Sequence, residues 1–87
     1  MRDRPYLERE WCERVRREPE EKRVQRNGRI QHWAFVSELA EALARVEGRE
    51  PEECVGYLRV VTLSDGETIH TAMPDRNYDR KRRRQRG

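Results

Sequence analysis

Residues 57–76 read "YLRVVTLSDGETIHTAMPDR" and decide the interpretation of the fold. Apolar and polar residues alternate on both sides of Asp65-Gly66, a pair typical of tight β-turns. The stretch therefore predicts an antiparallel hairpin. Pairing around this turn would set Ser64 opposite Glu67, Thr62 opposite Ile69, Val61 opposite His70 and Arg59 opposite Ala72.

A second hairpin is predicted upstream, in "EKRVQRNGRIQHWAFV" at residues 21–36. Asn27-Gly28 separates two extended runs and favours a type I′ turn, which needs positive φ at both central positions. The two hairpins together predict four antiparallel strands. Pairing around the turn would set Arg26 opposite Arg29, Val24 opposite Gln31 and Arg23 opposite His32.

Two helices complete the predicted α+β fold. The first runs from about Asp3, with Pro5 in its first turn, to about Glu18, and the second occupies about residues 38–47 between the hairpins. Ser37 can cap the second helix and Gly48 can end it. The apolar stripe of the first helix should lie on the sheet, and its members are Leu7, Trp11 and Val15.

The length of 87 residues and the charge distribution predict one domain with a tail. Residues 80–86, "RKRRRQR", carry six positive charges, which leaves 14 basic and 17 acidic residues elsewhere. We therefore assign residues 1–79 to a single domain and residues 80–87 to a disordered, arginine-rich tail. Such a tail can contact phosphate without sequence preference.

Alternation along the strands assigns the two faces of the sheet. On the first hairpin, one face contains Trp33 and Phe35 with Val24, and we call it the Trp33 face. If the first helix covers this face, a basic patch lies on the open face of the sheet. Ile30, Ala34 and Val36 instead favour burial of the opposite side. The patch would contain Arg23, His32, Tyr57, Arg59 and His70. The predicted core face of the second hairpin contains Leu58, Val60, Ile69 and Met73 with Thr62 and Thr71.

Two residues of this patch could carry acid–base chemistry. His70 could act as a general acid or base, and Arg59 could neutralise a phosphate or a transition-state charge. The alternatives are a partly exposed histidine and an ion pair between Arg59 and Asp75. Cys12 and Cys54 lie far apart in the sequence, so neither a metal site nor a cofactor is predicted.

The stretches "GRIQHWAFV" and "YLRVVTLSDGETIHTAMPDR" resemble a group of small uncharacterised bacterial proteins. That group is similar in element order to the RelE/ParE-type toxins of toxin–antitoxin modules, over about residues 20–78, with residues 37–54 as an insert. The resemblance implies a metal-independent RNA endonuclease with an antitoxin partner and RNA or the ribosome as target. The implied catalytic residues are Arg59, His70, Arg76 and Tyr78, and the implied RNA-binding residues are Arg23, His32, Tyr57, Arg82, Arg83 and Arg84.

A non-catalytic binding protein is the alternative function. It would act through its sheet face, a strand edge or the basic tail. The sequence has neither an apolar run at its N-terminus nor a stretch of membrane-spanning length, so we expect a cytoplasmic protein without membrane contact.

Overall fold

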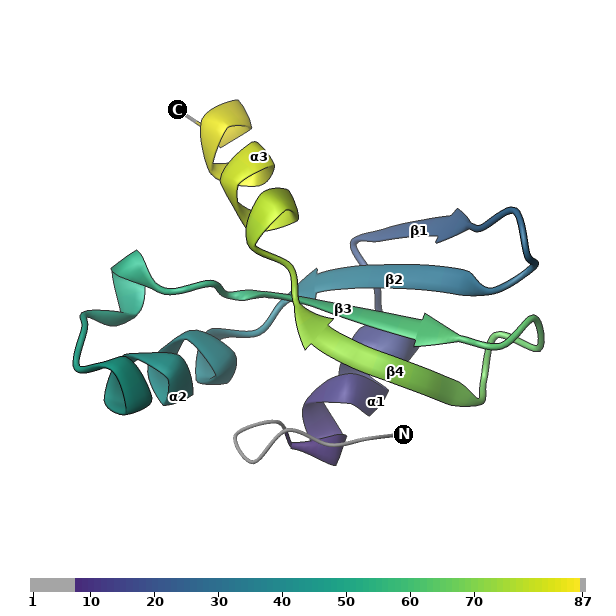
Figure 1. The fold of residues 1–87 in the computed structure, drawn as a ribbon, viewed down its shortest axis with the longest axis horizontal. Helices are drawn as coiled ribbons and strands as arrows, with labels where there is room; N and C mark the ends of the chain where they lie inside the picture. The colour runs from purple at the N-terminus through teal and green to yellow at the C-terminus, as the bar shows by residue number, and fades with distance from the viewer. Residues whose placement is uncertain (1–7, 87) are drawn as a thin grey trace.

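The computed structural model describes residues 8–86, with side chains described for residues 8–84. It confirms the α+β class, the N-terminal helix, the two hairpins and the short helix between them (Figure 1). The predicted helix start at Asp3 and Pro5 lies outside the described residues. The elements are α1 (Arg9–Arg17), β1 (Glu21–Val24), β2 (Ile30–Phe35), α2 (Ser37–Glu47), the 3-10 helix η1 (Pro51–Glu53), β3 (Tyr57–Thr62), β4 (Ile69–Pro74) and α3 (Arg76–Arg86).

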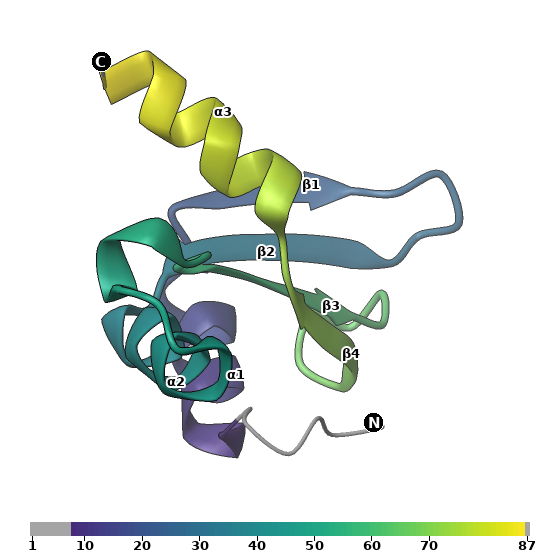
Figure 2. The same ribbon diagram turned by 60° about the vertical axis from the view of Figure 1, so that its left-hand side comes forward.

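The four strands form one antiparallel sheet in the order β1-β2-β3-β4, with β1 and β4 at its edges. Helices α1 and α2 lie on one side of this sheet, and α3 rises from the other side (Figure 2). Helix α2 ends at Gly48, whose φ of 67° is left-handed, as the sequence predicts. Ser37 is the first residue of α2, and Val36 occupies the cap position.

The main core lies between the sheet and helices α1 and α2. Cys12 and Val15 of α1 are fully buried against a floor of small or branched residues that includes Ala34 and Val60. The assignment of the Trp33 face to α1 is therefore wrong, and the opposite assignment, favoured by Ile30 and Ala34, is correct. Small side chains on that face let the helix approach closely, whereas the large aromatic rings need the separate cover that α3 provides.

The first hairpin closes through a three-residue loop in place of the predicted two-residue turn. The Gln25 N–H donates to the Arg29 carbonyl at 2.7 Å, and Gly28 adopts a φ of 91°. Asn27 keeps a negative φ and accepts a hydrogen bond from the Arg29 N–H at 3.0 Å. A single left-handed glycine after a type I turn is sufficient for this loop length. The predicted pairs are wrong by one residue, and the observed register pairs Glu21 with Trp33, Lys22 with His32, Arg23 with Gln31 and Val24 with Ile30.

The second hairpin turns at the predicted place, but its loop is longer than predicted and β4 contains an irregularity. The Leu63 N–H donates to the Thr68 carbonyl at 2.9 Å and the Gly66 N–H donates to the Leu63 carbonyl at 2.9 Å, so residues 64–67 form the loop and the predicted pair of Ser64 with Glu67 is wrong. Thr62 pairs with Ile69 as predicted, whereas Val61 pairs with Thr71 in place of His70. His70 is therefore the extra residue of a β-bulge.

Beyond the bulge, each side chain of β4 points to the face of the sheet opposite the predicted one. Arg59 pairs with Met73 and not with Ala72. Because the side-chain period of a strand is two residues, one inserted residue moves Ala72 into the core and places Thr71 and Met73 on the opposite face. The predicted core positions of Thr71 and Met73 are wrong for this reason.

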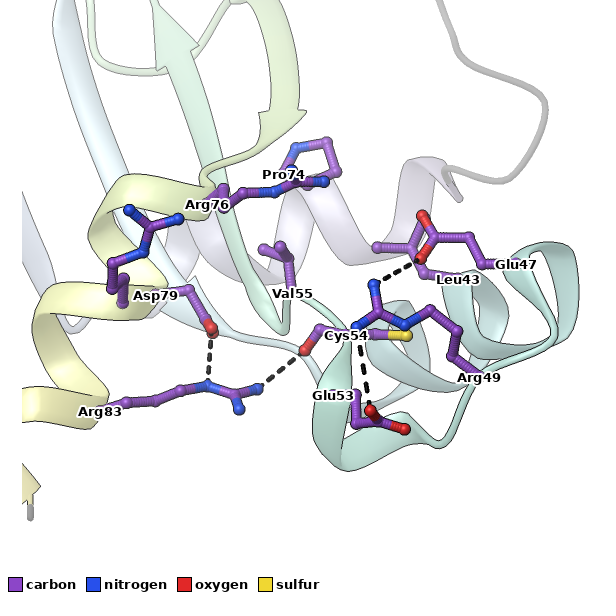
Figure 3. Close-up of a pocket in the computed structure, with 11 residues that line it drawn as sticks. Leu43, Glu47, Arg49, Glu53, Cys54, Val55, Pro74, Arg76, Asp79 and Arg83 are labelled. Carbon is purple, nitrogen blue, oxygen red and sulfur yellow. Dashed lines mark hydrogen bonds and ion pairs between the residues drawn. The ribbon is translucent and has the colours of Figure 1, made fainter.

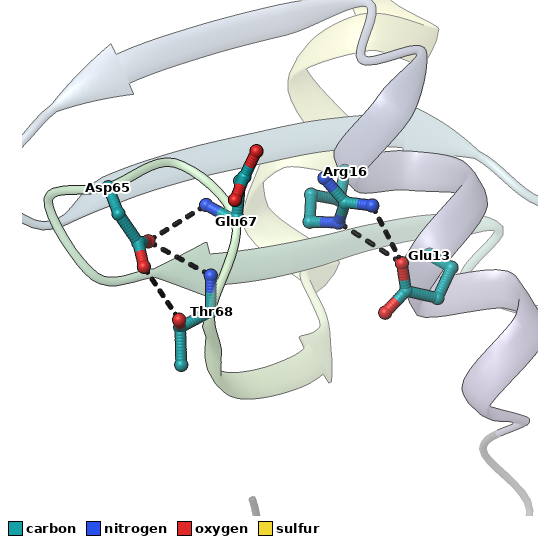
Figure 4. A network of polar contacts seen from close by, with 5 residues as sticks. All are labelled: Glu13, Arg16, Asp65, Glu67 and Thr68. Carbon is teal, nitrogen blue, oxygen red and sulfur yellow. Dashed lines mark hydrogen bonds and ion pairs between the residues drawn. The ribbon is translucent and has the colours of Figure 1, made fainter.

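Asp65 fixes the loop of the second hairpin. Its carboxylate accepts hydrogen bonds from the Glu67 N–H at 2.8 Å, the Thr68 N–H at 2.9 Å and the Thr68 hydroxyl at 2.6 Å (Figure 4). These bonds favour the ionised form, with the Thr68 hydroxyl contributing most, and lower the pKa of Asp65 to about 2. Asp65 therefore stays ionised and holds the loop throughout the physiological range.

The C-terminal segment is helical where the sequence predicts a disordered tail. Helix α3 continues from Arg76 to Arg86, so residues 80–86 belong to an ordered element. Residue 87 lies outside the described part of the chain.

His32 lies in the core between the sheet and α1, with 1% of its surface exposed. Its Nδ1 is 3.2 Å from the Val60 carbonyl oxygen. Burial lowers the pKa of His32, with smaller contributions from the positive charges of Lys22 and Arg16, so the folded protein favours the neutral ring.

We expect the stability of the protein to fall as the pH drops below about 6.5, the ordinary histidine pKa. The unfolded chain then takes up a proton that the buried His32 resists. Urea unfolding across this range should show a shallower loss of stability in His32→Gln than in the wild type. His70→Gln removes an exposed histidine and is the matched control. An equal pH dependence in the wild type and His32→Gln would contradict this assignment.

Candidate functional site

The sheet face opposite α1 carries an aromatic cluster in which Trp33, Tyr57 and Tyr78 are buried and Phe35 is half-exposed. The rings of Trp33 and Tyr78 stack with centroids 5.1 Å apart and an interplanar angle of 11°. Tyr57 meets Tyr78 edge to face at 5.1 Å, and Phe35 meets Tyr57 in the same manner at 5.6 Å. Tyr78 belongs to the first turn of α3, so this cluster joins the helix to β2 and β3.

Both buried phenols donate to carboxylates near β1. The Tyr57 hydroxyl donates to Glu20 at 3.1 Å, and the Tyr78 hydroxyl donates to Glu21 at 2.9 Å. Burial, together with the bond to Glu21, raises the pKa of Tyr78 to about 12. Tyr78 is therefore protonated at neutral pH and serves as a hydrogen-bond donor, which makes it a poor general base.

Asp75 connects the aromatic cluster with Arg59. Its carboxylate accepts hydrogen bonds from the Trp33 indole N–H at 2.9 Å and the Tyr78 backbone N–H at 3.0 Å. Arg59 lies 3.8 Å from the same carboxylate and donates to the Met73 sulfur at 2.8 Å. The Arg59 Nε is buried without a hydrogen-bond partner among the described residues. The ion pair with Asp75, predicted as the alternative role of Arg59, is thus present.

Two arginines cover the outer sides of the cluster. The Arg23 guanidinium lies 5.8 Å from the Trp33 ring centroid and pairs with Glu21 at 3.3 Å. Arg82 lies 6.0 Å from the Tyr57 ring centroid and pairs with Glu20 at 3.5 Å. Cation–π contact and ion pairing therefore engage two of the arginines that the resemblance assigns to RNA.

The structure separates the four implied catalytic residues. Arg59 and Tyr78 share one face and meet through Asp75. His70 is exposed at the bulge, three residues along β4 from the partner of Arg59, a separation of roughly 10 Å. Arg76, at the start of α3, is exposed and lines a different surface. His70 therefore lies outside the polar contacts that join Arg59, Asp75 and Tyr78 among the described residues.

The implied RNA-binding residues are also divided. His32 is buried on the α1 side, and Tyr57 is fully buried within the aromatic cluster. Arg83 holds α3 against η1, because its guanidinium donates to the Glu52 carbonyl at 2.6 Å and to the Cys54 carbonyl at 2.9 Å. Arg84 alone of this set is exposed without an ion-pair partner among the described side chains.

A groove of about 450 Å³ lies between the end of α2, η1 and α3 (Figure 3). Arg83 forms one side of it and pairs with Asp79 at 2.7 Å. The buried Asp79 carboxylate also accepts the Gly56 N–H at 3.2 Å. The lining residues are Leu43, Glu47, Arg49, Glu53, Cys54, Val55, Pro74, Arg76, Asp79, Arg80 and Arg83.

Sequence reasoning missed this groove and the part that Asp79 plays in it. The spacing of Asp79 and Arg83, four residues apart, is a signal for a helical ion pair and could have indicated order in the segment. The contacts from Arg83 to η1 join residues 29 and 31 positions apart, and no local pattern encodes them.

Neither a known protein family nor a curated protein nor a solved structure matches this chain. Among the described residues, no group of three or more His, Cys, Asp or Glu side chains could hold a metal ion. In the same part of the chain, none of the helices has the length and apolar character needed to cross a membrane.

We expect Asp75→Ala to lower the free energy of unfolding by about 2–3 kcal/mol. The substitution leaves the Trp33 indole N–H and the partly buried Arg59 charge without their acceptor and frees the first turn of α3. Urea unfolding followed by tryptophan fluorescence measures this loss. Glu41→Ala, a change at an exposed position of α2, controls for the removal of one negative charge. A loss for Asp75→Ala no larger than for this control would contradict the role assigned to Asp75.

Proposed function

We propose that the protein binds RNA through the phosphate backbone, without catalysis, by means of the solvent face of α3. We define this face as Arg76, Arg80, Lys81 and Arg84, all of which are exposed. None of the four has an ion-pair partner among the described side chains. This ordered set of unneutralised cations is the observation that carries the proposal.

The opposite side of α3 is bound to the body of the protein. Tyr78 and Asp79 are buried, and Arg82 and Arg83 contact Glu20 and η1. The helix therefore presents its cations in a fixed arrangement. Less conformational entropy is lost when an ordered helix binds than when a disordered tail does.

Like charges on the solvent face repel one another. Arg76, Arg80 and Arg84 follow at four-residue intervals, so their side chains are neighbours on the helix surface. Each such like-charged pair destabilises a helix by about 0.2–0.5 kcal/mol. A polyanion removes this repulsion on binding, which favours phosphate backbone as the partner.

The remainder of the chain limits where such a partner can bind. Residues outside 80–86 carry 14 basic and 17 acidic side chains, so as a whole they do not attract a polyanion, and Arg76 is the one of them that belongs to the solvent face of α3. Trp33, Tyr57 and Tyr78 are buried and cannot stack on bases, which leaves the half-exposed Phe35 as the accessible ring of the aromatic cluster. We therefore propose binding that depends on charge and not on base sequence, and the resemblance to RNA-directed toxins favours RNA over DNA.

We expect Lys81→Gln/Arg84→Gln to weaken binding of a single-stranded RNA oligonucleotide by a similar factor for every sequence tested. Each lost phosphate contact should also reduce the slope of log K against log salt concentration by about 0.7. Fluorescence anisotropy over a salt series measures both quantities. Arg17→Gln/Arg26→Gln removes two exposed charges elsewhere and is the matched control. Equal weakening by the two double variants would refute binding through α3.

A ribonuclease of the RelE/ParE type is the second candidate. Arg59 favours it, because this residue is partly buried, shares a face with Tyr78 and retains an unsatisfied Nε. A guanidinium with spare donor capacity could stabilise charge on a phosphate in the transition state. The distance of His70 along β4 and the protonated state of Tyr78 count against this candidate.

Induced expression in a bacterial host separates the two candidates. If the protein is a ribonuclease toxin, expression of the wild type should arrest growth, whereas expression of Arg59→Ala or His70→Ala should not. Circular dichroism must show that all three proteins are folded. The RNA-binding function that we propose predicts no difference in growth between the wild type and these variants. Growth arrest by the wild type that is absent with the two folded variants would overturn the non-catalytic proposal.

A further inference from the structure

We propose that the groove between α2, η1 and α3 binds a phosphate monoester of nucleotide size. Arg76 and Arg80 line the groove, and neither has an ion-pair partner among the described side chains. Figure 3 shows Arg76 beside Pro74 at one end of the groove, with Arg49 and its two glutamates across from them. Two arginines without ion-pair partners at one cavity supply the positive charge that a dianion requires.

The other charges of the groove are largely neutralised. Arg83 pairs with Asp79 at 2.7 Å, and Arg49 lies 3.8 Å from both Glu47 and Glu53. The four lining arginines face three carboxylates, which leaves a positive balance. The charge available to a ligand therefore resides on Arg76 and Arg80.

The chemical class of the ligand follows from charge and size. A phosphate monoester carries about −1.5 to −2 charges at pH 7, which complements two guanidinium groups better than a single carboxylate does. The groove of about 450 Å³ falls within the range of about 300–1,000 Å³ that small-molecule sites occupy. Leu43, Val55 and Pro74 supply apolar wall for a base or another non-polar group attached to the phosphate.

The arrangement of the groove is set by α3 and not by the ligand. Arg83 donates to two carbonyl oxygens of the η1 segment, and Asp79 accepts the Gly56 N–H, so the walls are joined to each other. The cavity is thereby formed before a ligand binds, which lowers the entropic cost of binding.

The phosphate could belong to a free nucleoside monophosphate or to the 5′-terminal nucleotide of an RNA. If the ligand is a free nucleoside monophosphate, the site does not depend on the proposed RNA-binding function. If the ligand is the 5′ end of an RNA, the site rests on that function. Both sources present the same phosphate monoester to Arg76 and Arg80.

Calorimetric titration at low ionic strength, with adenosine 5′-monophosphate, adenosine and inorganic phosphate as probes, tests the site. We expect the monophosphate to bind the wild type more tightly than either fragment. Arg76→Gln/Arg80→Gln should weaken this binding by at least about tenfold, because charge-assisted hydrogen bonds are lost. Arg17→Gln/Arg26→Gln removes the same number of exposed charges outside the groove and should retain the affinity.

A second titration compares a 5′-phosphorylated RNA trinucleotide with its 5′-hydroxyl form. If the wild type prefers the phosphorylated form and Arg76→Gln/Arg80→Gln does not, the ligand is the 5′ end of an RNA. Binding of the monophosphate without such a preference assigns the free nucleotide.

The inference is overturned if neither the monophosphate nor the phosphorylated trinucleotide binds in a manner that depends on Arg76 and Arg80. It is also overturned if inorganic phosphate binds as tightly as the monophosphate. Salt-dependent binding of longer 5′-hydroxyl RNA measures the proposed function separately. That binding can persist when the groove is empty, and the monophosphate can bind when long RNA does not.

Discussion

The carboxylate of Asp75 is the interaction on which the arrangement of both charged surfaces depends. It stands where β4 ends and α3 begins, accepts the indole N–H of Trp33, caps the first turn of α3 through the Tyr78 N–H and faces Arg59. This first turn joins α3 to the sheet, and Arg83 further along the helix donates to the η1 segment, so the two contacts together fix the direction of the helix (Figure 1). The positions of the solvent face of α3 and of the groove beside it follow from that direction.

Turn chemistry made the two hairpins and α2 predictable, since Asn27-Gly28, Asp65-Gly66 and Gly48 are local signals. The registers of the two hairpins were not encoded by these local signals. An Asn-Gly pair can close a two-residue or a three-residue loop, and the one-residue difference changes every cross-strand partner. The bulge at His70 leaves no clear mark in the sequence either, yet it moves the following residues of β4 to the other face.

The ordered state of α3 could not be inferred from its composition. A run of six positive charges predicts self-repulsion and disorder when it is considered alone. Its helical structure depends on tertiary contacts, in which Tyr78 stacks on Trp33 and Arg83 donates to the η1 segment. The sequence did identify Arg59, Tyr78 and the terminal arginines as residues of interest, but their division among separate surfaces needed the fold.

That division determines what the site can do. On the sheet face, the phenols donate to Glu20 and Glu21, and Arg59 faces Asp75, so most polar groups already have partners within the protein. A substrate there would have to displace these contacts at the cost of leaving buried groups unpaired. On α3 the balance is reversed, because exposed cations repel one another in the absence of an anion. An anionic ligand therefore gains most at α3, which is the physical reason for placing the function on the helix and not on the sheet.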